Sequence, residues 1–494
     1  MSAGRAPAVR HPAGTGGAPL ARVAALKMVQ APLLAAYAIL VPRLMGPGAY
    51  GEFALLLSLV AIALSLTDLG LTEVCGRFVP ELRRQGPDAV RRLGGGLFAV
   101  QAALGLVAAA LFVPLAHAAY GDRFPVRVLA LAAGVLVVGS LGSVPLALTF
   151  GLGRVARHAA RDPLRRALTL TLILLLFPPW GLAGAVAAVF ATEALLAGLY
   201  AVWTRRHLSL ERLASSRTFL RPYLRFGLLF FLSWGLLNVW LRLGNPLVEH
   251  FRGDAREVAV FDIPAQMFSI AGGFTLAVAS ALIPALSELR LDGDPEEAGR
   301  RTADALRWGG VFCATAFWVF TITAGELVPA LLGPGFERVA PNGSVLLLGL
   351  PFLLVAQMGF AFSVVDGRPS RYLTSLAAAV VALLAAASWA VPRWGGLGCA
   401  AAYAASSGVL AGVMTAAFRR ELLPRLRGPA LALAWSLPAA PLAFVDGGRG
   451  GALLRGAAFL IGYPLLLLAL RLVHLRELRT AWGTLVARRR REPR

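Results

Sequence analysis

Ionisable side chains stand inside several long apolar runs of this sequence, and these are the residues that could do chemistry in it. Each costs roughly 2.5 to 3.5 kcal/mol when inserted into a hydrocarbon layer, so it usually faces a cavity or a partner. Glu193 lies near the middle of the run 181–202, with no basic residue close to it in the sequence. A carboxyl group in a low dielectric is hard to ionise, which favours Glu193 as a protonation switch. The alternative is a neutral carboxyl that is hydrogen bonded to a neighbouring helix.

Arg242 is the clearest cation within an apolar run. It lies roughly sixteen residues past the start of the run 226–247, which places it about 24 Å into a hydrocarbon layer about 30 Å thick. A fixed cation that faces a central cavity would suit an anionic group such as a diphosphate. The alternative is that its long side chain reaches the outer interface, where Gly244-Asn245-Pro246 ends the helix.

Three uncharged or acidic residues are predicted to line an outward vestibule near Arg242. Asn238 belongs to the same run, and Asp262 and Gln266 stand four residues apart in the run 258–284, on one helix face. We regard these three residues, with Arg242, as candidate substrate-binding residues.

A further charged group closes the run 52–73. Glu73 and Arg77 are spaced i,i+4, which favours a structural pair on one helix face. Asp68 lies deeper in the run. Asp68 and Glu73 are candidate ion-coupling residues beside Glu193, and Arg77 is a candidate substrate-binding residue at the inner rim of a cavity.

Other residue types argue against enzymatic chemistry. Cys75, Cys313 and Cys399 have unrelated spacings, and the six histidines are scattered singly, so no metal site or catalytic triad is predicted. Lys27 is the only lysine, which excludes a phosphate-binding loop of the G-x-x-x-x-G-K-[ST] type. We expect no cofactor, no metal and no enzymatic activity.

The composition indicates that these residues belong to a polytopic membrane protein. The 494 residues are 57% hydrophobic and 15% charged, with a mean hydropathy of +0.69. Apolar runs of this length must be helical, because a bilayer leaves backbone groups no other partner. About fourteen spans are predicted, at 24–42, 52–73, 93–117, 128–151, 167–178, 181–202, 226–247, 258–284, 308–331, 343–365, 372–391, 397–417, 429–445 and 452–473.

The chain also repeats itself. Gly153-Arg154, Trp180-Gly181 and Arg205-Arg206 return 214 positions later, in the same order. The later copies are Gly367-Arg368, Trp394-Gly395 and Arg419-Arg420. Six spans in each copy give both halves the same orientation, as in parallel repeats of alternating-access transporters. The fold class predicted is therefore all-α and polytopic, with two parallel six-helix repeats and two extra C-terminal helices.

The distribution of charge fixes a predicted orientation. The net charge of +22 comes mostly from connections on one side of the spans. That asymmetry places both termini in the cytoplasm and explains the charge without a nucleic acid partner. The basic tail is expected to lie against anionic membrane lipids.

The predicted organisation has six parts. They are a disordered cytoplasmic N-terminus 1–19, a first six-helix lobe 20–206, a linker 207–225, a second lobe 226–420, two added helices 428–473 and a basic cytoplasmic tail 474–494.

Several short segments resemble a known family. Pro42–Phe53 resembles the junction of the first two helices in bacterial polysaccharide flippases, the Wzx-type members of the multidrug/oligosaccharidyl-lipid/polysaccharide exporter (MOP) superfamily. Thr67–Leu71 and Arg77–Glu81 are similar to the end of that family's second helix. Leu331–Phe336 and Trp394–Gly398 are similar to its segments before helix ten and at helix twelve.

The resemblance implies a function. Such proteins move an oligosaccharide on an undecaprenyl diphosphate carrier from the inner to the outer leaflet of the bacterial inner membrane. The resemblance also implies a cationic central cavity, coupling to H⁺ or Na⁺, and a polysaccharide polymerase and chain-length machinery as partners. The few cations within the spans, chiefly Arg242, depart from that expectation.

Other functions remain open at this stage. A multidrug cation antiporter and a peptidoglycan-precursor flippase use the same scaffold, although the antiporters commonly have twelve spans. A membrane-embedded glycan polymerase or ligase would need a large loop outside the membrane, and the predicted connections are short. A non-transporting scaffold would leave the repeat unexplained.

Overall fold

The computed structural model describes residues 17–208, 217–443, 445 and 448–469. The predicted tail 474–494, most of the predicted leader 1–19 and the middle of the predicted linker 207–225 lie outside these residues. The described part is helical and contains no strand. Its helices are α1 Gly17–Thr67, α2 Leu71–Gln85, α3 Pro87–Tyr120, η1 Gly121–Arg123, α4 Val126–Gly151, α5 Val155–Ala159, α6 Arg161–Thr204, η2 Arg205–His207, α7 Arg217–Arg242, α8 Gly244–Arg252, α9 Ala255–Asp292, α10 Pro295–Leu332, α11 Val339–Leu347, α12 Leu350–Val365, α13 Pro369–Trp394, α14 Gly396–Ala417, α15 Arg419–Leu422, η4 Leu423–Arg425, α16 Arg427–Ala434, η5 Leu437–Ala443 and α17 Gly448–Ala469.

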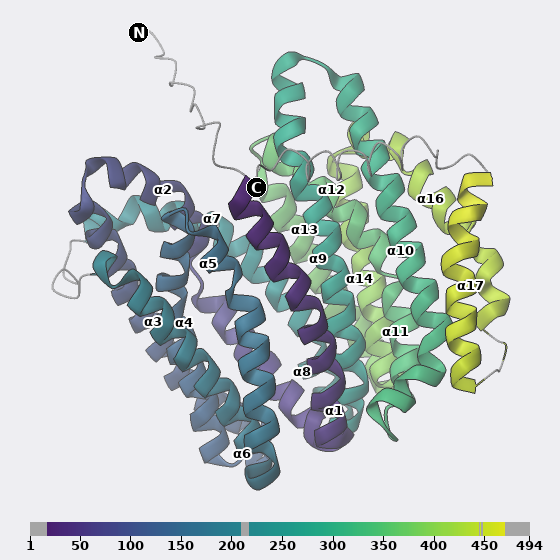
Figure 1. Ribbon diagram of the computed structural model, residues 1–494, viewed down its shortest axis with the longest axis horizontal. Helices are drawn as coiled ribbons and strands as arrows, with labels where there is room; N and C mark the ends of the chain where they lie inside the picture. Colours follow the sequence, from purple (N-terminus) through teal and green to yellow (C-terminus); the bar gives the residue numbers. More distant parts are fainter. Residues whose placement is uncertain (1–16, 209–216, 444, 446–447, 470–494) are drawn as a thin grey trace.

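The helices form two lobes (Figure 1). Helices α1 to α6 make the first lobe, and α7 to α14 make the second. Helices α16 and α17 pack against α10 on the outer side of the second lobe, where Arg455 of α17 pairs with Glu326 of α10 at 2.6 Å. We call the upper end in Figure 1, which holds α2, α5 and the α9–α10 hairpin, the basic end, and the lower end near α8 the opposite end.

Two glycines explain why the predicted spans outnumber the long helices. Gly46 (φ 70°) interrupts α1 and Gly181 (φ 55°) interrupts α6, in a backbone region that favours glycine. Each of these helices therefore contains two predicted spans. Among the described residues, ten helices are long and apolar enough to cross a membrane, or up to eleven if the bent pair Phe219–Leu228 and Phe231–Arg252 is one span.

One predicted span is not a regular helix. The segment predicted at 429–445 is divided between α16 and the 3₁₀ helix η5, and neither is long enough to cross a membrane. The all-helical, polytopic fold predicted from the sequence is nevertheless confirmed.

The internal repeat is visible in the backbone. The turns at 149–154 and 363–368 close with the same pair of hydrogen bonds, from the fifth residue to the second and from the sixth to the first. Gly181 (φ 55°, ψ −136°) and Gly395 (φ 58°, ψ −132°) share one unusual conformation, also 214 residues apart. The predicted duplication is therefore confirmed at the level of local geometry.

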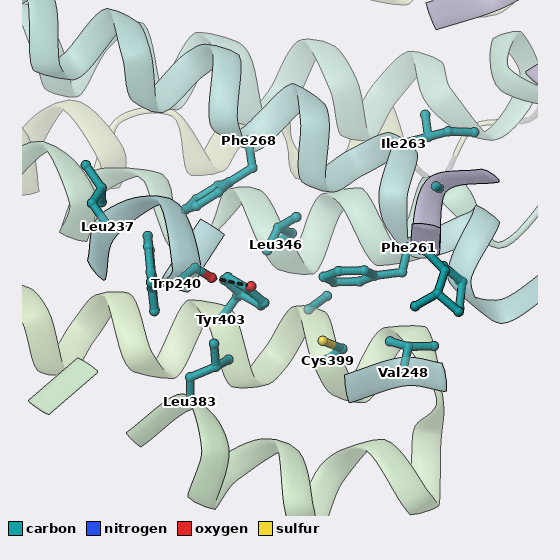
Figure 2. Close-up of a cluster of buried hydrophobic side chains, with 14 of the residues drawn as sticks. Leu237, Trp240, Val248, Phe261, Ile263, Phe268, Leu346, Leu383, Cys399 and Tyr403 are labelled. Atoms are coloured by element: carbon teal, nitrogen blue, oxygen red, sulfur yellow. Dashed lines mark hydrogen bonds between the residues drawn. The ribbon is translucent and has the colours of Figure 1, made fainter. Parts of the chain in front are cut away.

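A buried tyrosine sets the break between α7 and α8, next to Arg242. The Tyr403 hydroxyl donates to the carbonyl of Trp240 at 2.5 Å and accepts from the backbone N–H of Gly244 at 2.9 Å. Figure 2 shows Tyr403 and Trp240 in a cluster of buried side chains that also includes Phe261. A side chain at Gly244 would collide with Phe261, because a Cβ atom there would lie 2.2 Å from its ring.

We predict that Tyr403→Phe lowers the free energy of unfolding by about 1 to 3 kcal/mol, because two buried backbone groups lose a partner. Thermal unfolding of the purified protein, followed by tryptophan fluorescence, measures this effect. Tyr223→Phe is the control, since its hydroxyl makes no hydrogen bond to another described residue. Equal melting temperatures for both variants would contradict the prediction.

Candidate functional site

A cavity of about 620 Å³ lies between the two lobes. Its lining comes from α1, α3, α4 and α6 of the first lobe, from α7 and α9 of the second, and from the segment 68–73, which is the turn after α1 and the first residues of α2. That turn and the start of α6 belong to the basic end. None of the described residues that line it comes from the segments of the opposite end, 43–51 or 243–256. The cavity therefore reaches from the basic end toward the middle of the molecule.

Four arginines line this cavity. Arg161, Arg165 and Arg166 come from the first turns of α6, and Arg242 ends α7. Only Arg242 was predicted, because the apolar run used to place the span begins at 167. The helix itself begins at Arg161. The i,i+4 spacing of Arg161 and Arg165 was a signal that they share a helix face.

Glu193 faces two of these arginines. Its carboxylate lies 2.6 Å from Nε of Arg165 and 3.3 Å from Nη2 of Arg161, and only 5% of the residue is exposed. The interpretation of Glu193 as a carboxyl without a basic neighbour is therefore wrong. Both arginines precede it by about thirty residues in the sequence, and the hairpin within α6 at Gly181 brings them together.

The other two arginines are less compensated. The guanidinium of Arg166 lies over the Tyr37 ring, 5.0 Å from its centre, in a cation–π contact. Arg242 is exposed to the cavity and makes no hydrogen bond or ion pair with another described residue. Two positive charges thus remain available to an anion in the cavity.

Helix α7 presents three chemically different groups on one face. Trp234, Asn238 and Arg242 follow each other at intervals of four residues, and all three line the cavity. Asn238 donates to the carbonyl of Trp234 at 2.9 Å and is otherwise open to the cavity. This face offers a ring, an amide and a cation, in order of increasing depth from the basic end.

Asp262 lies behind the main cavity, while Gln266 reaches its wall. Asp262 is 4% exposed and accepts hydrogen bonds from Tyr50 at 2.7 Å, Asn245 at 2.7 Å and Gln266 at 2.6 Å. Gln266 also donates to the Tyr50 hydroxyl at 2.9 Å. Asp262 lines only a second, small cavity, so it is separated from the place where a large substrate could lie.

The remaining predicted residues lie at the mouth. Asp68 and Glu73 both line the cavity there, and Asp68 Oδ1 accepts from the backbone N–H of Gly70 at 3.1 Å. Arg77 is not part of the lining. Its guanidinium lies 4.8 Å from the centre of the Phe226 ring, where α2 packs against α7.

The opposite end is closed by contacts between the lobes. Arg123 of η1 pairs with Glu249 of α8. Gly51 of α1 lies against the backbone of Ala255, where an added Cβ would come within 1.7 Å of the carbonyl oxygen. Arg43 donates to the carbonyl of Leu331 at 3.2 Å. The cavity is therefore accessible from one end.

Solved structures share this architecture. The lipid II flippase MurJ in its inward closed conformation matches with a TM-score of 0.70 at 11% identity, over 91% of this chain and 98% of that one. The inward-facing conformation of a multidrug resistance MATE family transporter of the MOP superfamily matches with a TM-score of 0.65 at 16% identity, over 83% and 99%. Its outward-facing counterpart reaches 0.59 at 16% identity, over 84% and 98%. These similarities establish the fold. Of the two MATE conformations, the inward-facing one has the higher TM-score.

The sequence comparison identifies the family. A search of curated proteins finds no match. A family model described as "Polysaccharide biosynthesis protein" matches residues 22–290, which is more than half of the chain. This is the family expected from the loop and helix-end motifs. The chain belongs to the polysaccharide biosynthesis protein family, and its two six-helix repeats have the fold of the MOP-superfamily transporters.

Proposed function

We propose that this protein moves an undecaprenyl-diphosphate-linked oligosaccharide from the inner to the outer leaflet of the bacterial inner membrane, for the synthesis of a cell-surface polysaccharide. One observation carries the proposal: four arginines line a cavity that is shared by both lobes and opens at the basic end. By the positive-inside rule that end faces the cytoplasm, where both termini would also lie.

A diphosphate matches the charge of this cavity. Arg166 and Arg242 come from different lobes, so a single anionic group between them would contact both. Charge-assisted hydrogen bonds from arginine are strong and often bidentate, and a cavity shielded from water strengthens them further. Binding of the headgroup would therefore draw the two lobes toward each other.

The rest of the α7 face suits a sugar. Trp234 supplies an aromatic surface, and Asn238 supplies an amide that donates one hydrogen bond to the Trp234 carbonyl and is otherwise exposed to the cavity; both lie nearer the mouth than Arg242. A carbohydrate needs such a combination of apolar and hydrogen-bonding contacts. With the diphosphate at Arg242, the oligosaccharide would extend past these residues toward the basic end.

In this proposal, transport requires that the closed opposite end opens while the open basic end closes. The lobes rock as rigid bodies, so that the contacts of the opposite end separate while the basic end closes. Glu193 is the residue we assign to coupling. An anionic group that reaches Arg161 and Arg165 from the neighbouring arginines would compete with this buried carboxylate for them. We propose H⁺ as the ion that is coupled through Glu193.

The cavity disfavours the principal rival function. A multidrug antiporter binds amphiphilic cations, and four arginines would repel them. A glycan polymerase or ligase is also disfavoured, since the described connections between helices are short.

Cells that lack the gene test the proposed function. We expect them to accumulate a complete sugar–diphosphate carrier on the cytoplasmic leaflet, measured by mass spectrometry of lipid-linked oligosaccharides together with an assay of leaflet sidedness. Accumulation of a peptidoglycan precursor instead would reassign the substrate. Unchanged carrier pools with altered sensitivity to cationic drugs would contradict the proposal.

We predict that Arg242→Gln weakens binding of the carrier by about ten- to a hundredfold, because a charge-assisted contact is worth about 1.5 to 3 kcal/mol. Arg242→Lys should recover only part of the loss, since lysine lacks the planar fork. Titration of purified protein with undecaprenyl diphosphate measures both affinities. Arg127→Gln, on the exposed start of α4, is the matched control. Full affinity in Arg242→Gln would place the headgroup elsewhere.

We predict that Glu193→Gln binds undecaprenyl diphosphate more tightly than the wild type, because Arg161 and Arg165 lose their competing carboxylate. The same variant should translocate the carrier with a reduced dependence on pH. Glu297→Gln is the control, since Glu297 also pairs with two arginines, Arg300 and Arg301, but on an exposed connector. If affinity and pH dependence are both unchanged, Glu193 has no part in coupling.

A further inference from the structure

The mouth of the cavity carries negative charge, although four arginines line the rest of it. Asp68 follows α1, and Glu73 lies in the first turn of α2 at the basic end (Figure 1). Both carboxylates line the cavity, where Asp68 is exposed and Glu73 is half-buried. The proposed function assigns no role to either of them.

Neither carboxylate is neutralised by an arginine among the described residues. The i,i+4 ion pair predicted between Glu73 and Arg77 does not form, because the Arg77 guanidinium lies over two phenylalanine rings instead. The hydrogen bonds of Asp68 come from backbone N–H groups of the turn that follows it. The charged neighbour of Glu73 is Asp68 itself. Two adjacent carboxylates without a counter-charge favour the binding of a cationic group.

A buried amide beside the carboxylates lacks one partner. Gln101 of α3 also lines the cavity, and only 1% of the residue is exposed. Its Nε2 donates at 2.9 Å to the carbonyl of Thr67, the residue that precedes Asp68. Its Oε1 has no hydrogen-bond partner among the described residues. A buried acceptor without a donor is costly, so this oxygen is an independent indication that a ligand brings a donor to the mouth.

The turn after α1 holds these groups beside the helix that we assign to sugar binding. It packs closely on α7, since a Cβ atom at Gly70 would lie 2.6 Å from the carbonyl oxygen of Gly227. Trp234 follows Gly227 by seven residues, so it lies at most about 10 Å deeper along the helix. A sugar chain that extends from Arg242 past Trp234 therefore arrives at the two carboxylates.

A protonated amine on a sugar fits this end of the cavity. It carries one positive charge and three N–H donors, and the mouth offers two carboxylates and an amide oxygen as acceptors. An N-acetylated sugar is neutral, so it gains no charge-assisted hydrogen bond here. A sugar with a carboxyl group would be repelled by the like charge of both carboxylates.

We propose that Asp68, Glu73 and Gln101 form a subsite for a positively charged amino sugar, and that the protein selects an oligosaccharide with a free amino group over one with an acidic sugar. The inference rests on the proposed function and names the class of sugar that its site takes. The substrate is then zwitterionic, with its diphosphate at the arginines and its amine at the mouth.

Three carriers that differ in one substituent test the proposal on the full chain in lipid nanodiscs. Each is undecaprenyl diphosphate with a disaccharide whose inner sugar is glucose and whose outer sugar is glucosamine, N-acetylglucosamine or glucuronic acid. Titration is done below the pKa of the amine. We expect the glucosamine carrier to bind about tenfold more tightly than the acetylated one, and the glucuronic acid carrier to bind more weakly than both.

The double variant Asp68→Asn with Glu73→Gln should bind the glucosamine and N-acetylglucosamine carriers equally. It should bind undecaprenyl diphosphate without a sugar at least as tightly as the wild type does, because two charges that repel the diphosphate are removed. Glu81→Gln is the matched control and should keep the preference for the amine, since Glu81 is exposed on the same helix but outside the cavity lining.

Equal affinities of the wild type for the three carriers overturn the inference, and so does a preference for the amine that persists in the double variant. Both results leave the proposed function intact. If the wild type does not bind undecaprenyl diphosphate without a sugar, the proposed function fails and the inference fails with it.

Discussion

The hydrogen bond between the Tyr50 hydroxyl and the Asp262 carboxylate joins the two lobes at a buried position. In a bilayer a polar group without a partner is costly, so two lobes that share such a cluster stay together until the cluster is satisfied in another way. The backbone contact at Gly51 brings α1 close enough for this bond to form. With that end closed, the cavity is open at the basic end.

Charge inside the cavity is arranged by the same requirement. Arg161 and Arg165 lie within reach of Glu193, and the face of Arg166 is covered by Tyr37, so part of the positive charge is compensated before any ligand binds. This compensation lowers the free-energy cost of an empty, positively charged cavity within a membrane. An anionic ligand at Arg161 and Arg165 would have to compete with Glu193 for them. A cavity with unpaired arginines alone would bind an anion without such competition.

The sequence was sufficient for those features that depend on local pattern. Apolar runs located the helices, and the recurring Trp-Gly and Gly-Arg pairs located turns that proved to share backbone geometry. Contacts between helices were not accessible in the same way. Arg165 seemed to belong to a connection, because hydropathy marks where the apolar run begins and not where the helix does. Glu193 seemed isolated for a related reason, since its partners are distant in the sequence. Arg77 was predicted to lie at the rim of the cavity. The packing of α2 against α7 holds its side chain away from the cavity lining.

The duplicated architecture carries an asymmetric site. The positions 214 residues after Arg161, Arg165 and Arg166 hold Ser375, Ala379 and Val380, and the position that matches Glu193 holds Ser407. Ser375, Ala379 and Ser407 are fully buried, so the second copy uses this face for close helix packing where the first copy uses it to line the cavity. In the second lobe, Arg242, Trp234 and Asn238 reach the cavity from a single helix, α7. Among the described residues, the first lobe supplies three of the four arginines that line the cavity, and the second supplies one. Two copies of one fold thus differ at the cavity, where the first copy carries the cluster Arg161, Arg165 and Arg166.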